Sequence, residues 1–369
     1  MALNKPRRII VCLDGTWETP QEKTNVYKIY TGIDTASDHH LYEYKSTYCS
    51  GLGTNGKNPF LGGFFGYGIT SQIISAYQYI CINYRDEKDE IWLIGFSRGA
   101  YTARSLVGMI YNVGLLPEVN LERSREAYER YRDRFEYDHP NQIRSTRFRE
   151  EYQCKMPLIH FLGCFDTVGA LGVPKLPWYL GGSTLYGLFS SLHEFHDTKL
   201  SPIIKNAYHA ISIHEQREWF RPTLMRFSSA ANTDQQTLEQ VWFPGMHGDV
   251  GGQESGDNLL SCHSLYWMIS KARKNGLKFK TDITDCSVNS QFSYHDSYVS
   301  SFVYKLMPRD DRVIQKNSMT DTYTISQIYK HGQFNDYITA EQLAMYKSNT
   351  LRTFFDHILQ QEKNQIGSL

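Results

Sequence analysis

The sequence has no excess of charge of either sign, since 39 Lys and Arg side chains balance 39 Asp and Glu side chains among its 369 residues. Proteins that bind nucleic acid generally carry a basic excess that neutralises phosphate groups, so nucleic acid is excluded as an expected partner. The balance also excludes attachment to an anionic membrane through net positive charge. Any transient contact with a membrane must therefore come from a local surface.

Cysteine pairs are missing as well. The seven cysteines are widely scattered and none lies in a CxxC pair, which argues against a disulfide framework or a structural zinc site and favours synthesis in the reducing cytoplasm. The nearest approach to a zinc motif, the run HEFH from His193 to His196, is one residue short of HExxH. We expect neither a metal nor an organic cofactor.

Long hydrophobic runs are absent too. The apolar run that follows Arg7 and Arg8 stops at Asp14, which is typical of a buried strand and not of a signal peptide. The longest charge-free stretch, residues 58–84, holds four glycines together with polar side chains, which disfavours a membrane-spanning helix. The sequence therefore predicts a protein without a signal peptide or a transmembrane segment.

Short apolar runs that end at polar or glycine-bounded tips are the main positive signal. Runs of this length suit strands that are buried on both faces of a parallel sheet. Four runs cover residues 8–13, 91–96, 157–165 and 240–243, and a fifth, weaker run at 207–213 could equally be helical.

Helical periodicity lies between these runs. Apolar residues recur on one helix face from Ile69 to Tyr84 and again from Ala100 to Ile110, where Gly114 suits the C-terminal cap. Alternating strands and helices predict the α/β class, with a mostly parallel, doubly wound sheet, helical insertions and a helical C-terminal extension.

Two segments interrupt this alternation. Residues 118–155 hold nine basic and nine acidic side chains in a largely helical pattern, which predicts a solvated helical insertion, with an ion-pairing partner surface as the alternative. Residues 176–192 carry no charge and many aromatic side chains, which suits a lid. We expect a catalytic core over residues 1–275 and a mainly helical extension over residues 276–369 that packs on the core.

The sharpest local signal is Gly95-Phe96-Ser97-Arg98-Gly99, which follows a predicted buried strand and opens a predicted helix. This is the context of a nucleophile elbow, in which small neighbours allow the serine a strained backbone and the next amide faces a developing oxyanion. We expect Ser97 to be a nucleophile and the backbone of Arg98 to belong to the oxyanion hole. The alternative is a plain strand–helix turn with glycines for packing.

A serine nucleophile needs a general base that a third group orients. In α/β-hydrolases the chain order is serine, acid, histidine. Asp166 follows the run PLIHFLGCF, and His247 lies in the glycine-rich segment PGMHGDVGG, so both fit this order. The alternative for His247 is a loop histidine that bonds its own backbone.

Four further residues near strand ends are candidates to support the site. The backbone of Gly15 or Thr16, after the first strand, can donate the second oxyanion amide. Asp14 could cap a helix, pair with Arg98 or orient the loop, and we favour a structural role. Asp249 could stabilise its loop or orient the base.

Six stretches of the sequence match a known family: the first strand with DGTW, GFSRGAYTAR, FLGCFDTVGALG, FHDTKLSP, YHAISIHEQREWFRP and VWFPGMHGDVGG. Over roughly residues 8–270 the chain resembles the type VI lipase effector-like α/β-hydrolase family, whose characterised members are bacterial phospholipases. The resemblance implies an α/β-hydrolase fold with Ser97 as nucleophile, Asp166 as acid and His247 as base. It also implies export by a contact-dependent secretion system, with a secretion or immunity partner. Within the family's HALxxDE segment this chain has Glu215, which is therefore the reserve for the triad acid.

Access to lipid requires apolar surface near the site. Two glycine- and aromatic-rich stretches offer it as mobile loops or a lid: residues 60–67, with Phe64 and Phe65, and residues 176–192, with Trp178, Tyr179 and Leu180. The alternative is that both stretches pack over the core. We expect a serine hydrolase of carboxylic esters, most of all a phospholipase. The alternatives are a soluble small-molecule esterase or thioesterase, and a non-catalytic binding module.

Overall fold

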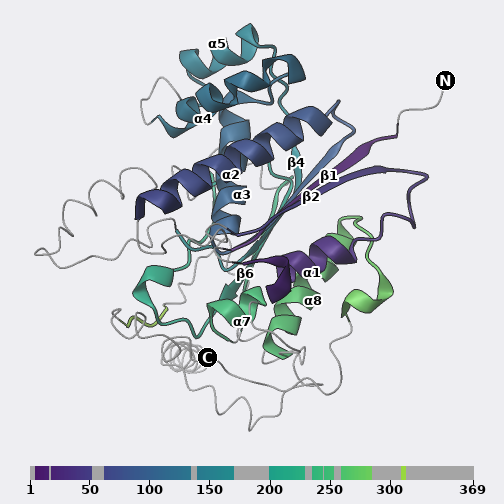
Figure 1. Cartoon of the computed structure of the whole chain (residues 1–369), viewed down its shortest axis with the longest axis vertical. Helices are drawn as coiled ribbons and strands as arrows, with labels where there is room; N and C mark the ends of the chain where they lie inside the picture. The colour runs from purple at the N-terminus through teal and green to yellow at the C-terminus, as the bar shows by residue number, and fades with distance from the viewer. Residues whose placement is uncertain are drawn as a thin grey trace, which may run out of the picture.

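The computed structural model describes residues 5–15, 18–51, 62–133, 139–169, 199–228, 235–243, 245–252, 259–284 and 309–312. A six-stranded sheet in the order β2-β1-β3-β4-β6-β8 forms the centre of this part, and every neighbouring pair is parallel (Figure 1). Its strands are β1 (Arg7–Leu13), β2 (Glu43–Cys49), β3 (Glu90–Phe96), β4 (Ile159–Phe165), β6 (Asn206–Ser212) and β8 (Thr237–Phe243). β5 (Lys199–Leu200) and β7 (Arg226–Phe227) form a separate parallel pair.

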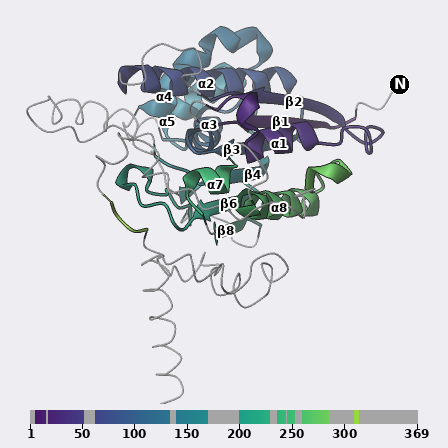
Figure 2. The same ribbon diagram turned by 60° about the horizontal axis from the view of Figure 1, so that its bottom comes forward.

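Helices cover both faces of the sheet, and Figure 2 shows α2 to α5 on one side and α1, α7 and α8 on the other. The α-helices are α1 (Asn25–Gly32), α2 (Gly62–Asn83), α3 (Arg98–Val113), α4 (Ser124–Arg132), α5 (Ile143–Glu151), α7 (His247–Gly251) and α8 (Leu259–Lys274). The short 3-10 helices are η1 (Pro20–Glu22), η2 (Glu118–Arg123), η5 (Glu218–Phe220) and η6 (Thr281–Thr284). This confirms the predicted α/β class and the doubly wound parallel sheet.

Each apolar run supplies both faces of the sheet. On β1, Ile9 and Val11 join the core under α2 and α3, whereas Ile10 and Cys12 join the core under α1 and α8. This follows from the alternation of side chains along a strand, and it explains why a fully buried parallel strand has a continuous apolar sequence.

Three segments show how the described elements compare with the predicted ones. The ambiguous run at 207–213 is a strand, β6, because both of its faces are covered. The edge strand β2, with the sequence EYKSTYC, was not predicted, because all its residues are half-buried and it lacks an apolar run. The stretch at 60–67, predicted as a loop, is helical from Gly62 onward, since extending an existing helix costs less than starting one.

The strand order reverses beside β1, because β2 pairs on one side of β1 and β3 on the other. In open parallel sheets such a reversal opens a crevice at the carboxyl ends of the strands, where ligands bind. The register brings these ends level: Leu13 pairs with Gly95, Gly95 with Cys164, and Phe165 with Ala210. The residues that follow β1, β3 and β4 therefore meet at one edge of the sheet.

Chain beyond residue 275 also packs on the core. Leu277 is fully buried, Phe279 forms a bridge with Ile33, and Arg312 is only 5% exposed. The predicted division into a core over 1–275 and an extension over 276–369 stays a prediction, although η2, α4 and α5 lie within 118–155. Most of the extension lies outside the described residues.

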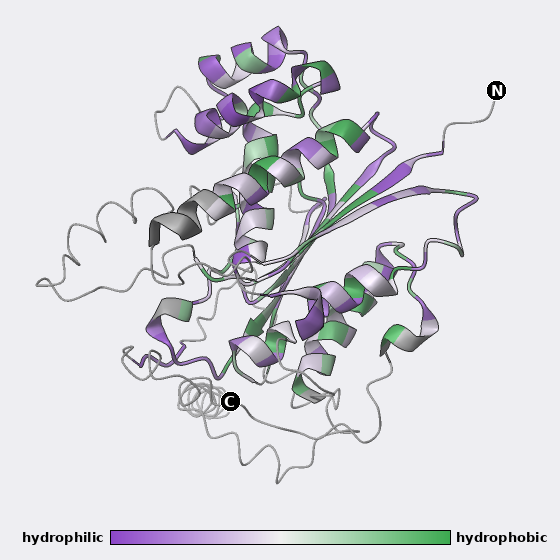
Figure 3. Cartoon of the chain, viewed as in Figure 1, coloured by the Kyte–Doolittle hydropathy of each residue, from purple (hydrophilic) through white to green (hydrophobic). Residues whose placement is uncertain are grey.

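The helical insertion is largely hydrophilic, as the mostly purple ribbons of α4 and α5 in Figure 3 show. Among the described residues no helix has both the length and the apolar character that crossing a membrane requires. Cys262 on α8 takes part in a disulfide, although its wide spacing from the other cysteines gave no sign of a partner, whereas the other described cysteines are free.

Candidate active site

Ser97 lies at a sharp turn between β3 and α3. Its backbone angles are φ 56° and ψ −120°, in the region that non-glycine residues rarely adopt. The Ser97 amide donates to the Phe165 carbonyl oxygen (2.9 Å), which ties the turn to the end of β4. Observed strain of this kind is typical of functional sites.

The two glycines of the pentapeptide are required by close packing. A Cβ atom at Gly95 would lie 2.6 Å from the Ala100 amide nitrogen, inside the turn itself. A Cβ atom at Gly99 would lie 2.1 Å from the carbonyl oxygen of Leu13, so the first turn of α3 touches the end of β1. The glycines thus let α3 begin directly against the loop that follows β1.

A hydrogen-bonded line runs from Ser97 through His247 to Asp166. Ser97 Oγ lies 2.8 Å from His247 Nε2, and His247 Nδ1 lies 2.6 Å from Asp166 Oδ2. His247 begins α7, and its ring lies between those of Phe96 and Phe220, with centroid distances of 4.8 and 5.0 Å. Both ring nitrogens therefore have a defined partner, and the aromatic rings hold the imidazole plane.

The imidazole of His247 is buried, with 3% of the residue exposed. Burial lowers the pKa of His247 below its ordinary value, although the hydrogen bond to Asp166 acts in the opposite direction. A neutral imidazole with Asp166 on Nδ1 presents an unprotonated Nε2 to the Ser97 hydroxyl. This is the protonation state that a general base needs.

Asp166 follows β4 with φ 37° and is fully buried. Its Oδ1 accepts from the Ser212 amide (2.9 Å) and from Arg312 Nη1 (2.6 Å), and its Oδ2 accepts from Arg312 Nη2 (2.9 Å) as well as His247. Burial alone would raise the pKa of Asp166, but Arg312 and His247 hold it well below its usual range. The carboxylate is therefore ionised although it is fully buried.

Arg312 was not predicted from the sequence. It lies 146 residues beyond Asp166 and belongs to no recognisable motif. In addition to Asp166 it donates to the Ser212 carbonyl oxygen (2.6 Å) and to the Phe220 carbonyl oxygen. Only the folded chain brings this guanidinium to the carboxylate.

Glu215, the predicted reserve acid, lies beside the line but contacts a different atom of His247. Its Oε2 accepts from the His247 backbone amide (3.3 Å), while its two oxygens pair with Arg217 at 2.7 and 2.8 Å. Burial alone would raise the pKa of Glu215, yet Arg217 lowers it. The ring nitrogen Nδ1 faces Asp166, so the geometry favours Asp166 over Glu215 as the acid.

Two of the predicted oxyanion donors, Arg98 and Gly15, lie in the described part of the chain. Arg98 is the first residue of α3, at the positive end of its dipole. The Gly15 amide, however, donates to Asp14 Oδ1 (2.8 Å), and Thr16 lies outside the described residues. An amide that already donates to a carboxylate is a poor partner for an oxyanion, which leaves Thr16 as the stronger of the two alternatives.

Asp14 and Asp249 both hold loops. Asp14 is buried, and its Oδ2 accepts from Tyr48 Oη (2.7 Å) and from the hydroxyl of Thr24, which caps α1. Burial raises the pKa of Asp14 despite these hydrogen bonds. Asp249 Oδ2 accepts from the Met246 amide (2.8 Å) and so caps the start of α7. These contacts agree with the structural role favoured for Asp14 and with the loop-stabilising alternative for Asp249.

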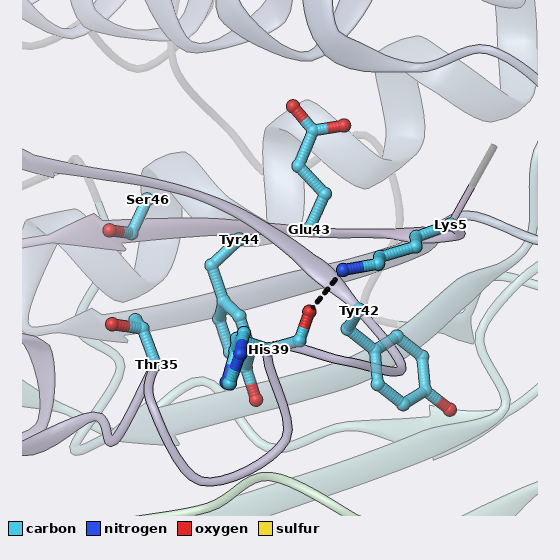
Figure 4. A pocket seen from close by; sticks show the side chains of 7 residues that line it. All are labelled: Lys5, Thr35, His39, Tyr42, Glu43, Tyr44 and Ser46. Carbon is cyan, nitrogen blue, oxygen red and sulfur yellow. Dashed lines mark hydrogen bonds between the residues drawn. The ribbon is translucent and has the colours of Figure 1, made fainter. Parts of the chain in front are cut away.

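The predicted substrate-binding residues cannot be placed at this site. Phe64 and Phe65 belong to the first turns of α2, but their side chains lie outside the described part of the chain, as do Trp178, Tyr179 and Leu180. A cavity of about 550 Å³ lies at the other end of the strands, beside Glu43 at the start of β2 (Figure 4). It contains none of the predicted catalytic residues. Within the described ranges no group of three or more His, Cys, Asp or Glu side chains could hold a metal ion.

Parts of this chain are similar to known proteins. A yeast protein described as "Uncharacterized protein YEL023C" (Saccharomyces cerevisiae) is 31% identical over 242 residues, which are 58% of this chain and 32% of the yeast protein. Among solved structures, an uncharacterized protein from Pseudomonas aeruginosa has a TM-score of 0.43 at 17% identity, covering 76% of this chain and 47% of that one. The Tle1 effector bound to the VgrG spike of the type 6 secretion system has the same score and identity, covering 70% and 53%. The chain thus spans about half or less of the length of these relatives.

Because one relative is a yeast protein, the bacterial origin that the family resemblance implies stays a prediction. The family described as "T6SS, Phospholipase effector Tle1-like, catalytic domain" matches residues 7–271, which contain all six strands of the main sheet and Ser97, Asp166 and His247. The chain therefore belongs to the Tle1-like phospholipase effector family.

Proposed function

We propose that this protein is a serine hydrolase that cleaves carboxylic esters of membrane phospholipids. The observation that carries the proposal is the line from Ser97 Oγ to His247 Nε2 (2.8 Å) and from His247 Nδ1 to Asp166 Oδ2 (2.6 Å) at a strained strand–helix turn. A plain structural turn does not need a neutral histidine on the serine hydroxyl, nor an ionised acid buried behind it.

The reaction begins when His247 Nε2 takes the proton of Ser97 as Oγ attacks the ester carbonyl carbon. The carbonyl π electrons move to oxygen, and the amides of Arg98 and Thr16 donate to this oxyanion. Asp166 stabilises the imidazolium through Nδ1 without taking its proton. When the oxyanion collapses, the bond to the alcohol oxygen breaks, and His247 returns the proton to the departing lysophospholipid.

The second half hydrolyses the acyl-enzyme. His247 Nε2 takes a proton from water as its oxygen attacks the acyl carbonyl, and the bond to Ser97 Oγ breaks with return of the proton to Oγ. The products are a fatty acid and the free enzyme. Both halves of the reaction use the same base and the same oxyanion donors.

The substrate class rests on family membership and not on a described pocket. The family name assigns phospholipase activity to the domain that residues 7–271 match. We extend to this chain the lipid substrate, the transient membrane contact and the export through a contact-dependent secretion system. Acyl-chain binding by the stretches at 60–67 and 176–192 stays a prediction.

The test is lipid mass spectrometry after incubation with vesicles of phosphatidylethanolamine and phosphatidylglycerol. The wild-type protein is expected to release lysophospholipid and fatty acid, and Ser97→Ala is expected to release neither and to lose labelling by a fluorophosphonate probe. Ser37→Ala, at an exposed loop serine, is the matched control and retains both activities. Lipolysis by a folded Ser97→Ala variant would refute the mechanism, whereas activity confined to short soluble esters would refute the phospholipid substrate alone.

A further inference from the structure

We propose that Arg312 is a positioning residue of the catalytic site, which holds Asp166 in place by a two-pronged ion pair and sets the acid limit of activity through its charge. This inference rests on the proposed function, since it assigns a role relative to the Ser97–His247–Asp166 line. Its basis is the contact between one guanidinium and both oxygens of the acid, at 2.6 and 2.9 Å.

Both terminal nitrogens of the Arg312 guanidinium donate within the site. Arg312 Nη1 also donates to Ser212 Oγ (2.7 Å) and to the Ser212 carbonyl oxygen (2.6 Å), while Nη2 also donates to the Phe220 carbonyl oxygen. These partners lie at the end of β6 and in η5, so one side chain joins the acid to two other segments of the site. The planar fork of arginine matches a carboxylate in this way, and lysine has no equivalent.

The segment that carries Arg312 is itself docked. Residues 309–312, the short yellow-green piece in Figure 1, pair with the loop that follows β6. Arg309 forms a bridge with Arg217, the Asp310 amide donates to the Gln216 carbonyl oxygen (2.9 Å), and the Asp311 carboxylate accepts from Gln216 Nε2 (2.8 Å). A segment that lies far beyond β4 in the sequence thus supplies a charged partner of Asp166.

Other charged groups face the same site, and Arg312 differs from them in what it touches. Glu215 and Arg217, in the loop after β6, pair with each other, and Glu215 accepts from the His247 backbone amide. Both charges also act on the His247 ring: Arg217 lowers its pKa and Glu215 raises it. His209 on β6 accepts from the Thr167 amide, next to Asp166, and the charge of Arg104 on α3 lowers the pKa of His209. Among these groups Arg312 alone bonds the carboxylate that bonds the catalytic imidazole.

The electrostatic consequence has a definite sign. A cation on the far side of Asp166 stabilises the ionised acid and disfavours a second cation on His247, so it extends the neutral, basic form of His247 to lower pH. Without the Arg312 charge, the buried Asp166 carboxylate acts undiminished on the imidazolium, and the carboxylate itself is easier to protonate. Both effects move the acid limit of activity toward higher pH, by about one pH unit or more.

The experiment measures the second-order rate of fluorophosphonate labelling of Ser97 from pH 4.5 to 9. Relative to wild type, Arg312→Gln is expected to shift the acid limb upward by about one unit, which is about a tenfold loss of rate on that limb. Arg312→Lys keeps the charge without the two-pronged contact, so its acid limb is expected to lie between those of wild type and Arg312→Gln. It also keeps the test decisive where Arg312→Gln does not fold.

Arg221→Gln is the matched control, because Arg221 is an exposed arginine that pairs with Asp310 on the same segment. It is expected to leave the acid limb unmoved. The inference is overturned if the acid limbs of both Arg312 variants superimpose on that of wild type. It is also overturned if Arg221→Gln shifts the acid limb as much as Arg312→Gln does. Absence of Ser97-dependent labelling in the wild-type protein refutes the proposed function itself, so the two failures are distinguishable.

Discussion

His209 offers a quantitative test of how the loop that carries the acid is held. It lies fully buried on β6, where its Nε2 accepts from the Thr167 amide (3.0 Å) and its Nδ1 lies 3.3 Å from Gln240 Oε1. Because Thr167 directly follows Asp166, this hydrogen bond fixes the backbone of the acid. A protonated ring would set a donor against the Thr167 donor and break the bond.

The magnitude follows from linkage. Burial and then the charge of Arg104 lower the pKa of His209 from 6.5 to about 3. A histidine with a lowered folded-state pKa contributes stability that is complete above about pH 6.5 and is lost as the pH falls, because the unfolded chain binds the proton more readily. At about 1.4 kcal/mol per unit, the free energy of unfolding loses about 2 kcal/mol between pH 7 and pH 5 from this residue.

The assay is urea unfolding of wild type and His209→Gln at pH 7, 6 and 5. Glutamine can accept from the Thr167 amide through Oε1 but does not titrate, so its stability deficit should shrink by about 2 kcal/mol over this range. His139→Gln, at an exposed turn, is the control for replacement of a histidine by glutamine outside the core. A wild-type minus His209→Gln difference that is the same at pH 7 and pH 5 would show that the burial argument is wrong.

Three further predictions concern Ser97, Asp166 and Glu215. Ser97→Gly should unfold with a free energy about 1 kcal/mol higher than Ser97→Ala in urea, since glycine adopts φ 56° without strain, and equal stabilities would contradict the strain. Asp166→Asn should lower the turnover of a chromogenic ester by about four orders of magnitude. Glu215→Gln should instead weaken the buried pair with Arg217 and lower the free energy of unfolding by about 3 kcal/mol. Its loss of turnover should be smaller than that of Asp166→Asn. A larger loss of turnover in Glu215→Gln than in Asp166→Asn would make Glu215 the acid.

The buried strands and the elbow could be predicted because local sequence encodes them. Apolar runs at 8–13 and 91–96 become β1 and β3 with shifts of one residue, and Gly114 ends α3 as expected, with φ 71°. The turn at Ser97 needs only small neighbours, which its own pentapeptide supplies. These features depend on residues within one helical turn or one strand of each other.

Edge elements could not be predicted for the converse reason. β2 is half-exposed along its whole length, so the sequence EYKSTYC has no apolar run or alternation that a strand requires. Its strand state comes from pairing with β1 over seven residues, from Arg7 with Glu43 to Leu13 with Cys49. Pairing across the sheet, and not its own side chains, makes this segment a strand.

The sequence by itself determined the parallel α/β class and the order Ser97, Asp166, His247, because strand burial and turn chemistry are local. The tertiary structure alone decided which atoms meet: Asp166 and not Glu215 on His247 Nδ1, Asp14 on the Gly15 amide, and Arg312 on both oxygens of Asp166. A buried charge must find its counter-charge wherever the chain passes, and that partner lies 146 residues away in the sequence. Spacing therefore predicted the line, and packing supplied the cation behind it.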